Sequence, residues 1–540
     1  MMDPGRRRCG LNIADLAVDR HVDDGHGQRP ALLWVGGEGR RVIFTFADLK
    51  QQSDRFANVL DRLGLTAGDT VAVCTGRIPE LYIAALGIWK RRCVFCPLFS
   101  EFGTDPLFHR LARSRAIALV TTQDFYRRNV ADLQKRLPAL RHVLLTDAAE
   151  HTHHGLWSLP GLMSDAVAPY TLPATDPEEH AILHFTSGTS GMPKGAVHVH
   201  DALRTHYETG RCVLDLHPQD VFWCTADPAW VTGTSYGIIA PLLIGATNIV
   251  DGGEFQVERW YRILSDQAVT VWYTSPSAIR RLMRYEGNPR QTYDLKALRL
   301  IFSVGEPLAG AAVDWAEEVL GLPIYDTWWQ TETGAIMLSS AVAPCIRPGS
   351  MGVAIPGITA AVVRRIGKER LVVTAEPNTV GELALKPGWS SMFRTYLDAP
   401  DEYAECFRGG WYLSGDLVRC DVDGYFWFVG RADDIIKTAG HLVSPFEVES
   451  LLMTHPAVFE AAAIGVPDEM VGERVKAIVS LKPGVLPGAD LHRELLAFAR
   501  RRLGPAIAPR EIEFSQDLPK NQAGKVLRRT LRARNRGGES

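Results

Sequence analysis

The chain of 540 residues has no apolar run long enough to cross a membrane. A membrane-spanning helix needs about 20 consecutive apolar residues. The most apolar stretch, from Tyr236 to Val250, is shorter than this and is interrupted by Pro241 and Gly245. No apolar run follows the basic first residues either, so a secretory signal is not expected. We therefore expect a cytoplasmic protein with no membrane partner, whose core includes Tyr236 to Val250.

An excess of charge of one sign is also missing. The chain has 59 Lys and Arg residues against 62 Asp and Glu residues, a formal net charge of −3. Nucleic acids and anionic membranes attract proteins that carry a strong positive excess. This balance predicts no nucleic-acid partner.

A disulfide or zinc framework is not indicated. The nine cysteines are an odd number scattered along the chain, which favours a reducing compartment. Cys93 and Cys96 form a single CxxC with no second pair at zinc-finger spacing, so we interpret them as buried thiols of a strand. The stretch HTHHG, from His151 to Gly155, has no cysteine beside it and is interpreted as a solvated loop.

The order of apolar segments predicts an α/β fold with mixed sheets flanked by helices. The length exceeds what one hydrophobic core usually supports, so at least two domains are expected. Helical spacing from Thr45 to Leu65 is followed by a strand from Asp69 to Cys74. A further helix beginning near Ile78 and a strand from Arg115 to Thr122 continue this alternation, which is typical of βαβ units.

The pattern changes near Gly430. Ser444 and Glu447 form a capping-box pattern with Pro445 at the first helical position, which predicts a helix start. Short strands, a helix near Leu491 to Leu503 and a basic tail follow. We expect a large N-terminal domain over residues 1–432 and a small α+β domain over residues 433–540.

The stretch HFTSGTSGMPKGAVHVH, from His184 to His200, is rich in glycine and hydroxyl side chains and contains a single cation, Lys194. It lacks the GxxxxGK[ST] spacing of a Walker A loop. Strand-like sequence on both sides predicts the tip of a hairpin. A structural turn would account for the glycines, but the hydroxyl groups beside a lysine favour phosphate binding.

Five motifs in order resemble the adenylate-forming superfamily of acyl-CoA synthetases, peptide-synthetase adenylation domains and luciferases. They are TSGTSGMPKG (186–195), DTWWQTETG (326–334), YLSGDL (412–417), GRADDIIKTAGH (430–441) and PKNQAGKVLRR (519–529). VGEPL, DTWWQTETG and AWVTGTSYGIIAPL are similar to the acetyl-CoA synthetase branch.

The resemblance implies a two-step reaction with ATP, a small-molecule carboxylate and CoA as substrates and Mg2+ as cofactor. A carboxylate attacks the α-phosphate of ATP to give acyl-AMP and pyrophosphate, and the CoA thiol then displaces AMP.

By this resemblance, Thr331 contacts the α-phosphate and Glu332 ligates Mg2+. The implied ATP- and AMP-binding residues are Thr186, Ser187, Gly188, Thr189, Ser190, Gly191, Lys194, Gly305, Glu306, Pro307, Asp326, Thr327, Trp328, Gln330, Thr331, Asp416 and Arg431. Asp416 is assigned to the ribose hydroxyls, and Arg431 to the ribose or the phosphates.

The resemblance also assigns roles in the small domain. Lys525 bridges the carboxylate and the α-phosphate during adenylation. Asp433 is the hinge about which the small domain rotates, and Gly440 then borders the pantetheine tunnel for CoA. A lysine acetyltransferase or deacetylase acting on Lys525 is a further expected partner, since acetylation would remove its charge.

Trp329, with Val231, Thr232 and Val304, is implied to form the acyl pocket, where an indole leaves space for only a few carbons. Acetate is the first choice and propionate the next. An aryl- or medium-chain ligase and an enzyme that loads a carrier protein in trans stay open as alternatives, and a non-catalytic scaffold is least favoured.

The pattern departs from acetate-activating relatives at three positions. Ala439, Leu442 and Arg92 stand where those relatives commonly carry serine, arginine and glycine. The segment HLVSPFEVE is closer to aryl- or medium-chain ligases.

Overall fold

The computed structural model describes residues 10–37, 39–149, 155–187, 193–366, 370–432, 434–438, 441–468, 470–505, 507–520 and 526–536. The chain divides into two compact units. Unit 1 comprises Met1–Gly305, Trp315–Val342 and Pro387–Cys406, and unit 2 comprises Glu306–Asp314, Ala343–Lys386 and Phe407–Ser540. The domain boundary predicted at residue 433 falls within unit 2. It stays a prediction.

Unit 1 contains two sheets, each with a parallel centre. The first sheet has antiparallel strands at one edge and the second has them at both edges. The first sheet has the order β20 (Thr395–Tyr396), β9 (Pro193–Val199), β8 (His180–Ser187), β4 (Val94–Pro97), β3 (Thr70–Cys74), β5 (Ala118–Thr121), β6 (His142–Leu145), β7 (Leu156–Ser158). The second has the order β15 (Leu338–Ser339), β14 (Ile324–Trp328), β13 (Leu300–Ser303), β12 (Val271–Thr274), β10 (Val221–Cys224), β11 (Thr247–Asp251), β1 (Pro30–Val35), β2 (Arg41–Thr45). The predicted α/β class with mixed sheets is confirmed.

Helices connect the parallel strands, as the βαβ alternation predicts. The α-helices within unit 1 are α1 (Arg20–Asp23), α2 (Phe46–Arg62), α3 (Pro79–Lys90), α4 (Thr104–Ser114), α5 (Gln123–Phe125), α6 (Leu159–Asp165), α7 (Leu203–Cys212), α8 (Val231–Thr234), α9 (Ala240–Ile244), α10 (Val257–Asp266), α11 (Pro276–Leu282), α12 (Pro289–Thr292) and α14 (Pro400–Glu405). Helix α13 (Gly310–Val319) has residues assigned to each unit. None of the helices in the described part of the chain is both long and apolar enough to cross a membrane.

Local sequence explains where α2 begins. The Thr45 side chain accepts a hydrogen bond from the Asp48 backbone at 3.1 Å, and Asp48 accepts one from the Thr45 backbone at 2.9 Å. This reciprocal capping box satisfies two backbone donors that the helix itself leaves unpaired. The expected helix is therefore confirmed, although it ends at Arg62 and not at Leu65.

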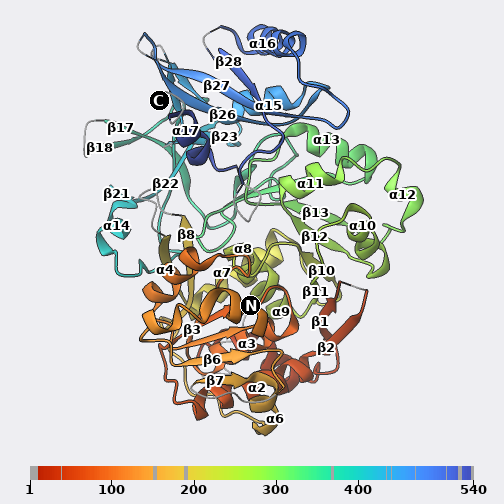
Figure 1. Ribbon diagram of the computed structural model, residues 1–540, viewed down its shortest axis with the longest axis vertical. Coiled ribbons are helices and arrows are strands. Elements are labelled where there is room, and N and C mark those ends of the chain that lie inside the picture. The colour runs from red at the N-terminus through yellow and green to blue at the C-terminus, as the bar shows by residue number, and fades with distance from the viewer. Residues whose placement is uncertain are drawn as a thin grey trace. The chain divides into compact units, whose positions relative to one another are not determined.

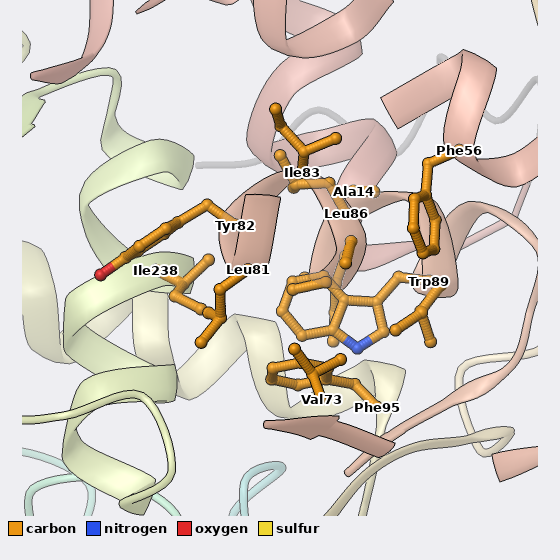
Figure 2. Close-up of a cluster of buried hydrophobic side chains, with 14 of the residues drawn as sticks. Ala14, Phe56, Val73, Leu81, Tyr82, Ile83, Leu86, Trp89, Phe95 and Ile238 are labelled. Carbon is orange, nitrogen blue, oxygen red and sulfur yellow. The ribbon is translucent and has the colours of Figure 1, made fainter. Parts of the chain in front are cut away.

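Helix α3 is buried from Leu81 to Lys90, since it lies inside unit 1 between α2 and the first sheet (Figure 1). Most of its side chains are apolar, and the buried Lys90 at its end pairs with Asp19 and Asp54. Figure 2 shows Trp89 of α3 among Phe56, Val73 and Phe95. The Trp89 and Phe95 rings meet edge-on at 5.5 Å. Gly87 allows α2 to approach closely, since a Cβ there would lie 2.7 Å from the Phe56 ring. A substitution at Gly87 would therefore push α2 and α3 apart.

Two interpretations of apolar segments are confirmed. The stretch from Tyr236 to Val250 is buried and contributes to the core of unit 1. Cys96 lies on β4, and Cys93 is the residue directly before the first residue of that strand. Burial raises the pKa of both thiols to about 12. Of HTHHG, residues 151–154 lie outside the described part.

In unit 2, one sheet is antiparallel and the other mixed. The first has the order β18 (Arg370–Val373), β17 (Ala360–Ile366), β19 (Gly381–Leu385), β22 (Trp411–Cys420), β21 (Phe407–Arg408), with β23 (Phe426–Arg431) also paired to β22. The second has the order β25 (His441–Val443), β24 (Ile436–Thr438), β27 (Gly472–Leu481), β26 (Val458–Asp468), with β28 (Glu511–Phe514) parallel to β27. Helices α15 (Pro445–Met453), α16 (Ala489–Leu503) and α17 (Arg528–Arg536) and the short β16 (Val353–Ala354) complete unit 2.

The α+β character of the C-terminal segment is confirmed, with one correction. The strands expected to be short form a long hairpin, 11 residues in β26 and 10 in β27. Both faces of this hairpin are covered, which supports its length. Ala461 and Ala463 belong to the cluster that includes α15 and α16, while Ala462 and Ile464 pack with Leu531 of α17. Ser444 caps α15 as predicted, accepting a hydrogen bond from the Glu447 backbone.

Five buried histidines in unit 1 make its stability depend on pH. Burial lowers the pKa of His21 and His198 to about 4 and that of His184, His200 and His206 to about 3. The unfolded chain binds protons near pH 6.5, so it takes up more protons than the folded chain as the pH falls below that value.

We expect the free energy of unfolding to decrease from pH 6.5 to pH 5, by roughly 2 kcal/mol for each histidine. Urea midpoints measured at pH 7, 6 and 5 test this. Asp15 and Asp326 act in the opposite direction, because burial raises the pKa of their carboxyl groups to about 6 and about 8. A urea midpoint that did not change between pH 7 and pH 5 would contradict the burial of these five rings as neutral groups.

Candidate active site

The glycine-rich loop joins two paired strands. Thr186 stands opposite Lys194, and Ser187 opposite Pro193, in the antiparallel pair β8 and β9. The predicted hairpin is therefore confirmed. Four of its predicted phosphate-binding residues lie outside the described part of the chain: Gly188, Thr189, Ser190 and Gly191.

Lys194 lies against two residues that the sequence did not indicate. Its ammonium group is 2.5 Å from the carboxylate of Glu402 on α14 and 5.2 Å from the centre of the Tyr396 ring on β20. Strand β20 pairs with β9, with Tyr396 opposite Ala196, and this register brings the ring to the loop. The Lys194 side chain is 20% exposed, so it can still meet a ligand.

Glu332 meets the same tyrosine. The Tyr396 hydroxyl donates a hydrogen bond of 2.6 Å to Glu332 Oε1. Glu332 follows β14, and Lys194 is 138 residues away in the sequence, yet both contact one ring. An acid and a cation are thus gathered beside the glycine-rich loop.

A rigid turn holds the segment that carries Gln330, Thr331 and Glu332. Gly334 has a φ of +72°, and a Cβ there would lie 2.1 Å from the Ser391 carbonyl oxygen. Its own carbonyl oxygen is 2.9 Å from His206 Nε2 and accepts from the Ser235 hydroxyl at 3.1 Å. Only glycine fits this position without displacing the backbone.

Asp326 on β14 is a buried carboxyl group with an unused oxygen. Burial raises its pKa to about 8, and Oδ1 has no hydrogen-bond partner among the described residues. Ser303, its register partner on β13, also has a buried hydroxyl without a partner in that part of the chain. Unpaired buried polar groups are costly, so this pair suits a ligand that carries hydrogen-bonding groups.

The other adenine candidates are divided between the units. Thr327 and the half-buried Trp328 follow Asp326 on β14, but the Thr327 hydroxyl already donates to the Ser303 carbonyl at 2.7 Å. Gly305 ends a segment of unit 1 with a φ of +91°. Glu306 and Pro307 belong to unit 2.

Asp416 and Arg431 are brought together in unit 2. They are opposite each other on β22 and β23, and Arg431 Nη1 donates to Asp416 Oδ1 at 2.9 Å. Asp416 is buried, whereas a third of the Arg431 side chain is exposed.

The four acyl-pocket candidates are all buried in unit 1. Val231 and Thr232 begin α8, Val304 follows β13, and Trp329 follows β14. Carboxyl ends of neighbouring parallel strands lie at one edge of a sheet, where α/β proteins bind ligands. Val304 and Trp329 therefore share that edge with Asp326.

Three residues with predicted roles lie outside the described part of the chain: Asp433, Gly440 and Lys525. Ala439 lies outside it as well. The chain on either side of Lys525 is anchored. Lys520 and Val526 form a backbone bridge, and Arg528 contacts Glu449 at 2.6 Å and Asp434 at 3.3 Å.

The departure at Arg92 has a structural account. Arg92 takes a φ of +61°, which glycine adopts more easily. Its guanidinium group makes two hydrogen bonds to the Glu179 carboxylate, at 2.6 and 2.7 Å. This bidentate contact offsets the backbone strain.

Replacing Glu402 with glutamine should lower the KM for ATP about two- to fivefold, because the Glu402 carboxylate competes with phosphates for the Lys194 ammonium. Partly exposed ion pairs of this kind contribute about 0.2–1 kcal/mol. Glu405→Gln is the matched control, since it removes the same charge from the same helix. An unchanged KM, or an equal effect of both variants, would show that Glu402 does not hold the loop lysine.

Comparison with known proteins identifies the family. The model of the AMP-binding enzyme matches residues 19–397, and that of the AMP-binding enzyme C-terminal domain matches residues 447–525. The acetyl-coenzyme A synthetase of Bacillus subtilis is 42% identical over 525 residues, 97% of this chain and 90% of that protein. The one of Pyrobaculum aerophilum is 37% identical over 97% of this chain and 83% of its own.

Solved structures agree on the fold. An anthranilate CoA ligase in complex with anthranoyl-AMP has a TM-score of 0.89, with 28% identity and 99% of both chains covered. An acyl-CoA synthetase of Brucella canis has a TM-score of 0.75, with 32% identity over 99% of this chain and 96% of that one. The resemblance drawn from the five motifs is confirmed, and the chain belongs to the AMP-binding family of adenylate-forming enzymes.

Proposed function

We propose that this chain is an AMP-forming acyl-CoA synthetase, an acid–thiol ligase that activates acetate first and propionate next. The two acetyl-coenzyme A synthetases, 42% and 37% identical over nearly the whole chain, support AMP-forming acetyl-CoA synthesis. ATP and CoA are the co-substrates of this reaction.

The observation that carries the proposal is the meeting of Lys194 and Glu332 around Tyr396, beside the glycine-rich loop. Charge develops on the phosphates as pyrophosphate leaves, and preorganised donors and cations stabilise it. Lys194 supplies a cation, Thr331 a hydroxyl group near the α-phosphate, and the loop its backbone donors. Tyr396 keeps the Glu332 carboxylate in place through its hydrogen bond.

The donor set fits a magnesium ion that arrives with ATP. Mg2+ is usually held by one or two carboxylates together with substrate phosphates and water. Among the described residues, no group of three His, Cys, Asp or Glu could hold a metal by itself. We assign Glu332 as the single carboxylate ligand, and the bound ion would neutralise phosphate charge.

The nucleoside assignments rest on two sets of polar groups: the Asp326 carboxyl of unit 1 and the Asp416–Arg431 pair of unit 2. In unit 1, the Asp326 carboxyl, whose Oδ1 has no partner among the described residues, accepts a hydrogen bond from the adenine amino group, with Gly305, Thr327 and Trp328 as further adenine-binding residues. Glu306 and Pro307 of unit 2 keep the adenine-binding role that the motif resemblance implies. Asp416 binds the ribose hydroxyls, with Arg431 beside it to hold the carboxylate in place.

The two half-reactions use different faces of the small domain, residues 433–540. Lys525 lowers the repulsion between the carboxylate and the α-phosphate. The domain then turns about Asp433 and brings Gly440 to the pantetheine tunnel. An acetyltransferase that modified Lys525 would stop the first step alone. A cytoplasmic location stays a prediction.

A second candidate is an aryl-acid CoA ligase, because the anthranilate CoA ligase has a similar fold over the whole chain. Trp329 separates the two candidates. Its indole is buried and held by a hydrogen bond. As the proposed end wall of the acyl pocket, it would leave space for a short acid rather than for an aromatic ring.

AMP formation measured with carboxylates from C2 to C8 and with benzoate, each with and without CoA, tests the proposal. We expect the highest kcat/KM with acetate and the next with propionate, and thioester only when CoA is present. Benzoate as the best substrate would favour the aryl ligase. Turnover that needed a carrier protein instead of CoA would favour carrier loading.

A further inference from the structure

The indole of Trp329 is tied to the sheet by a chain of hydrogen bonds. Trp329 Nε1 donates to the Tyr273 hydroxyl at 3.0 Å, and that hydroxyl is 2.8 Å from Thr327 Oγ1. Thr327 in turn donates to the Ser303 carbonyl at 2.7 Å. Tyr273, Ser303 and Thr327 lie on the adjacent strands β12, β13 and β14. Tyr273 is in register with Phe302, and Ser303 with Asp326, so these hydrogen bonds link three strands and step toward their carboxyl ends.

The direction of each bond follows from counting protons. The single hydroxyl proton of Thr327 points to the Ser303 carbonyl, so Thr327 must accept from Tyr273. Tyr273 has then used its own proton, and its oxygen accepts from the indole N–H of Trp329. Every donor in the chain has an acceptor, which favours one orientation of the indole.

Ring packing surrounds the indole, but among the described residues it is the Tyr273 hydroxyl that accepts from the indole N–H. The Tyr236 ring meets the indole edge-on with 5.2 Å between ring centres, and meets the Tyr273 ring at 5.6 Å. Tyr273 is fully buried, and burial raises the pKa of its phenol well above the usual range. The phenol therefore keeps its proton near neutral pH.

We propose that Tyr273 determines acid specificity by fixing the plane of Trp329 as the end wall of the acyl pocket. Tyr273 acts as a positioning residue, because it reaches the pocket only through the indole. The inference rests on the proposed function, which makes Trp329 that wall. Without the Tyr273 oxygen, the buried indole N–H loses its acceptor, and the indole turns toward other partners and opens the pocket.

Tyr273→Phe should reduce the preference for acetate over butyrate, measured as the ratio of kcat/KM values, by about tenfold. The change should come mainly from a higher KM for acetate. Trp329→Phe removes the same bond from its other end and keeps an aromatic wall. It should shift the ratio in the same direction. If Tyr273→Phe folds poorly, Trp329→Phe tests the inference in its place.

Tyr236→Phe is the matched control. Tyr236 is also fully buried, and its hydroxyl also makes two hydrogen bonds, one with Thr209 and one accepted from the Ile336 backbone. Its ring packs on the same indole but does not bond to the indole N–H. It should lower thermal stability much as Tyr273→Phe does and leave the acetate-to-butyrate ratio unchanged.

Adding Tyr273→Phe to Trp329→Gly separates the inference from its premise. If Tyr273 acts through the indole, the double variant has the same ratio as Trp329→Gly alone. If Trp329→Gly shifts the ratio but Tyr273→Phe does not, the positioning role is overturned and the pocket wall stands. If Trp329→Gly leaves the ratio unchanged, the pocket assignment and the inference both fail.

Discussion

Lys525→Ala should lower acyl-AMP formation by about a thousandfold, the scale expected when a group that stabilises transition-state charge is removed. Lys525 is the cation that we assign between the carboxylate and the α-phosphate, and it serves the first half-reaction only. Thioester formation from supplied acetyl-AMP and CoA should therefore stay within a few-fold of the unmodified enzyme. Pyrophosphate exchange and thioester release, measured separately, give the two rates.

Lys520→Ala is a control from the same segment. Lys520 is paired with Glu460 at 2.6 Å, so its ammonium group already has a structural partner. Both half-reactions should continue in this variant. Lys525→Gln, which like acetylation removes the charge, should behave as Lys525→Ala. Equal loss of both half-reactions in Lys525→Ala would show that Lys525 is not specific to adenylation.

Trp329→Gly should move the preference from acetate toward acids of four to six carbons. Removing the indole opens space for several methylenes, each worth about 0.8 kcal/mol when buried. A hydrophobic pocket discriminates by roughly 10–200-fold per methylene, so the butyrate-to-acetate ratio of kcat/KM should rise at least about tenfold. Acetate itself should bind more weakly in the enlarged cavity.

Loss of a buried tryptophan also costs stability, on the order of 3–5 kcal/mol. Trp260→Gly supplies the comparison, because Trp260 on α10 is 5% exposed and Trp329 is 8% exposed. It should destabilise the protein without changing the order of the acids. A uniform loss of activity in Trp329→Gly, with the order of acids unchanged, would make Trp329 a plain core residue and would remove the argument for acetate.

Local patterns predicted the parts of the fold whose causes are local. The capping box at Thr45, the apolar helix before Arg91 and the hairpin around the glycine-rich loop each depend on a few neighbouring residues. The length of the β26–β27 hairpin could not be predicted from its apolar residues. It depends on α15 and α16 covering one face and α17 the other, and these contacts join residues far apart in the sequence.

In the candidate active site, too, the sequence predicted what depends on local motifs and missed contacts between distant residues. Motifs indicated Lys194 and Glu332, because their residue types stand in recognisable order. Tyr396, which contacts both, and Glu402, which pairs with Lys194, lie in a stretch with no phosphate-binding pattern. The link from Trp329 to Tyr273 spans 56 residues and three strands, so only the register of β12, β13 and β14 reveals it. The same holds for Asp326, whose unpaired oxygen is a property of its surroundings.

The central claim is that the chain couples ATP cleavage to activation of a short carboxylate. Exchange of labelled pyrophosphate into ATP, in the presence of Mg2+ and without CoA, tests this claim most directly. We predict exchange that depends on added acetate, is weaker with butyrate and is absent without a carboxylate. When CoA is supplied, we predict that acetyl-CoA and AMP are formed. Failure of every acid from C2 to C8 and of benzoate to support exchange would contradict the account.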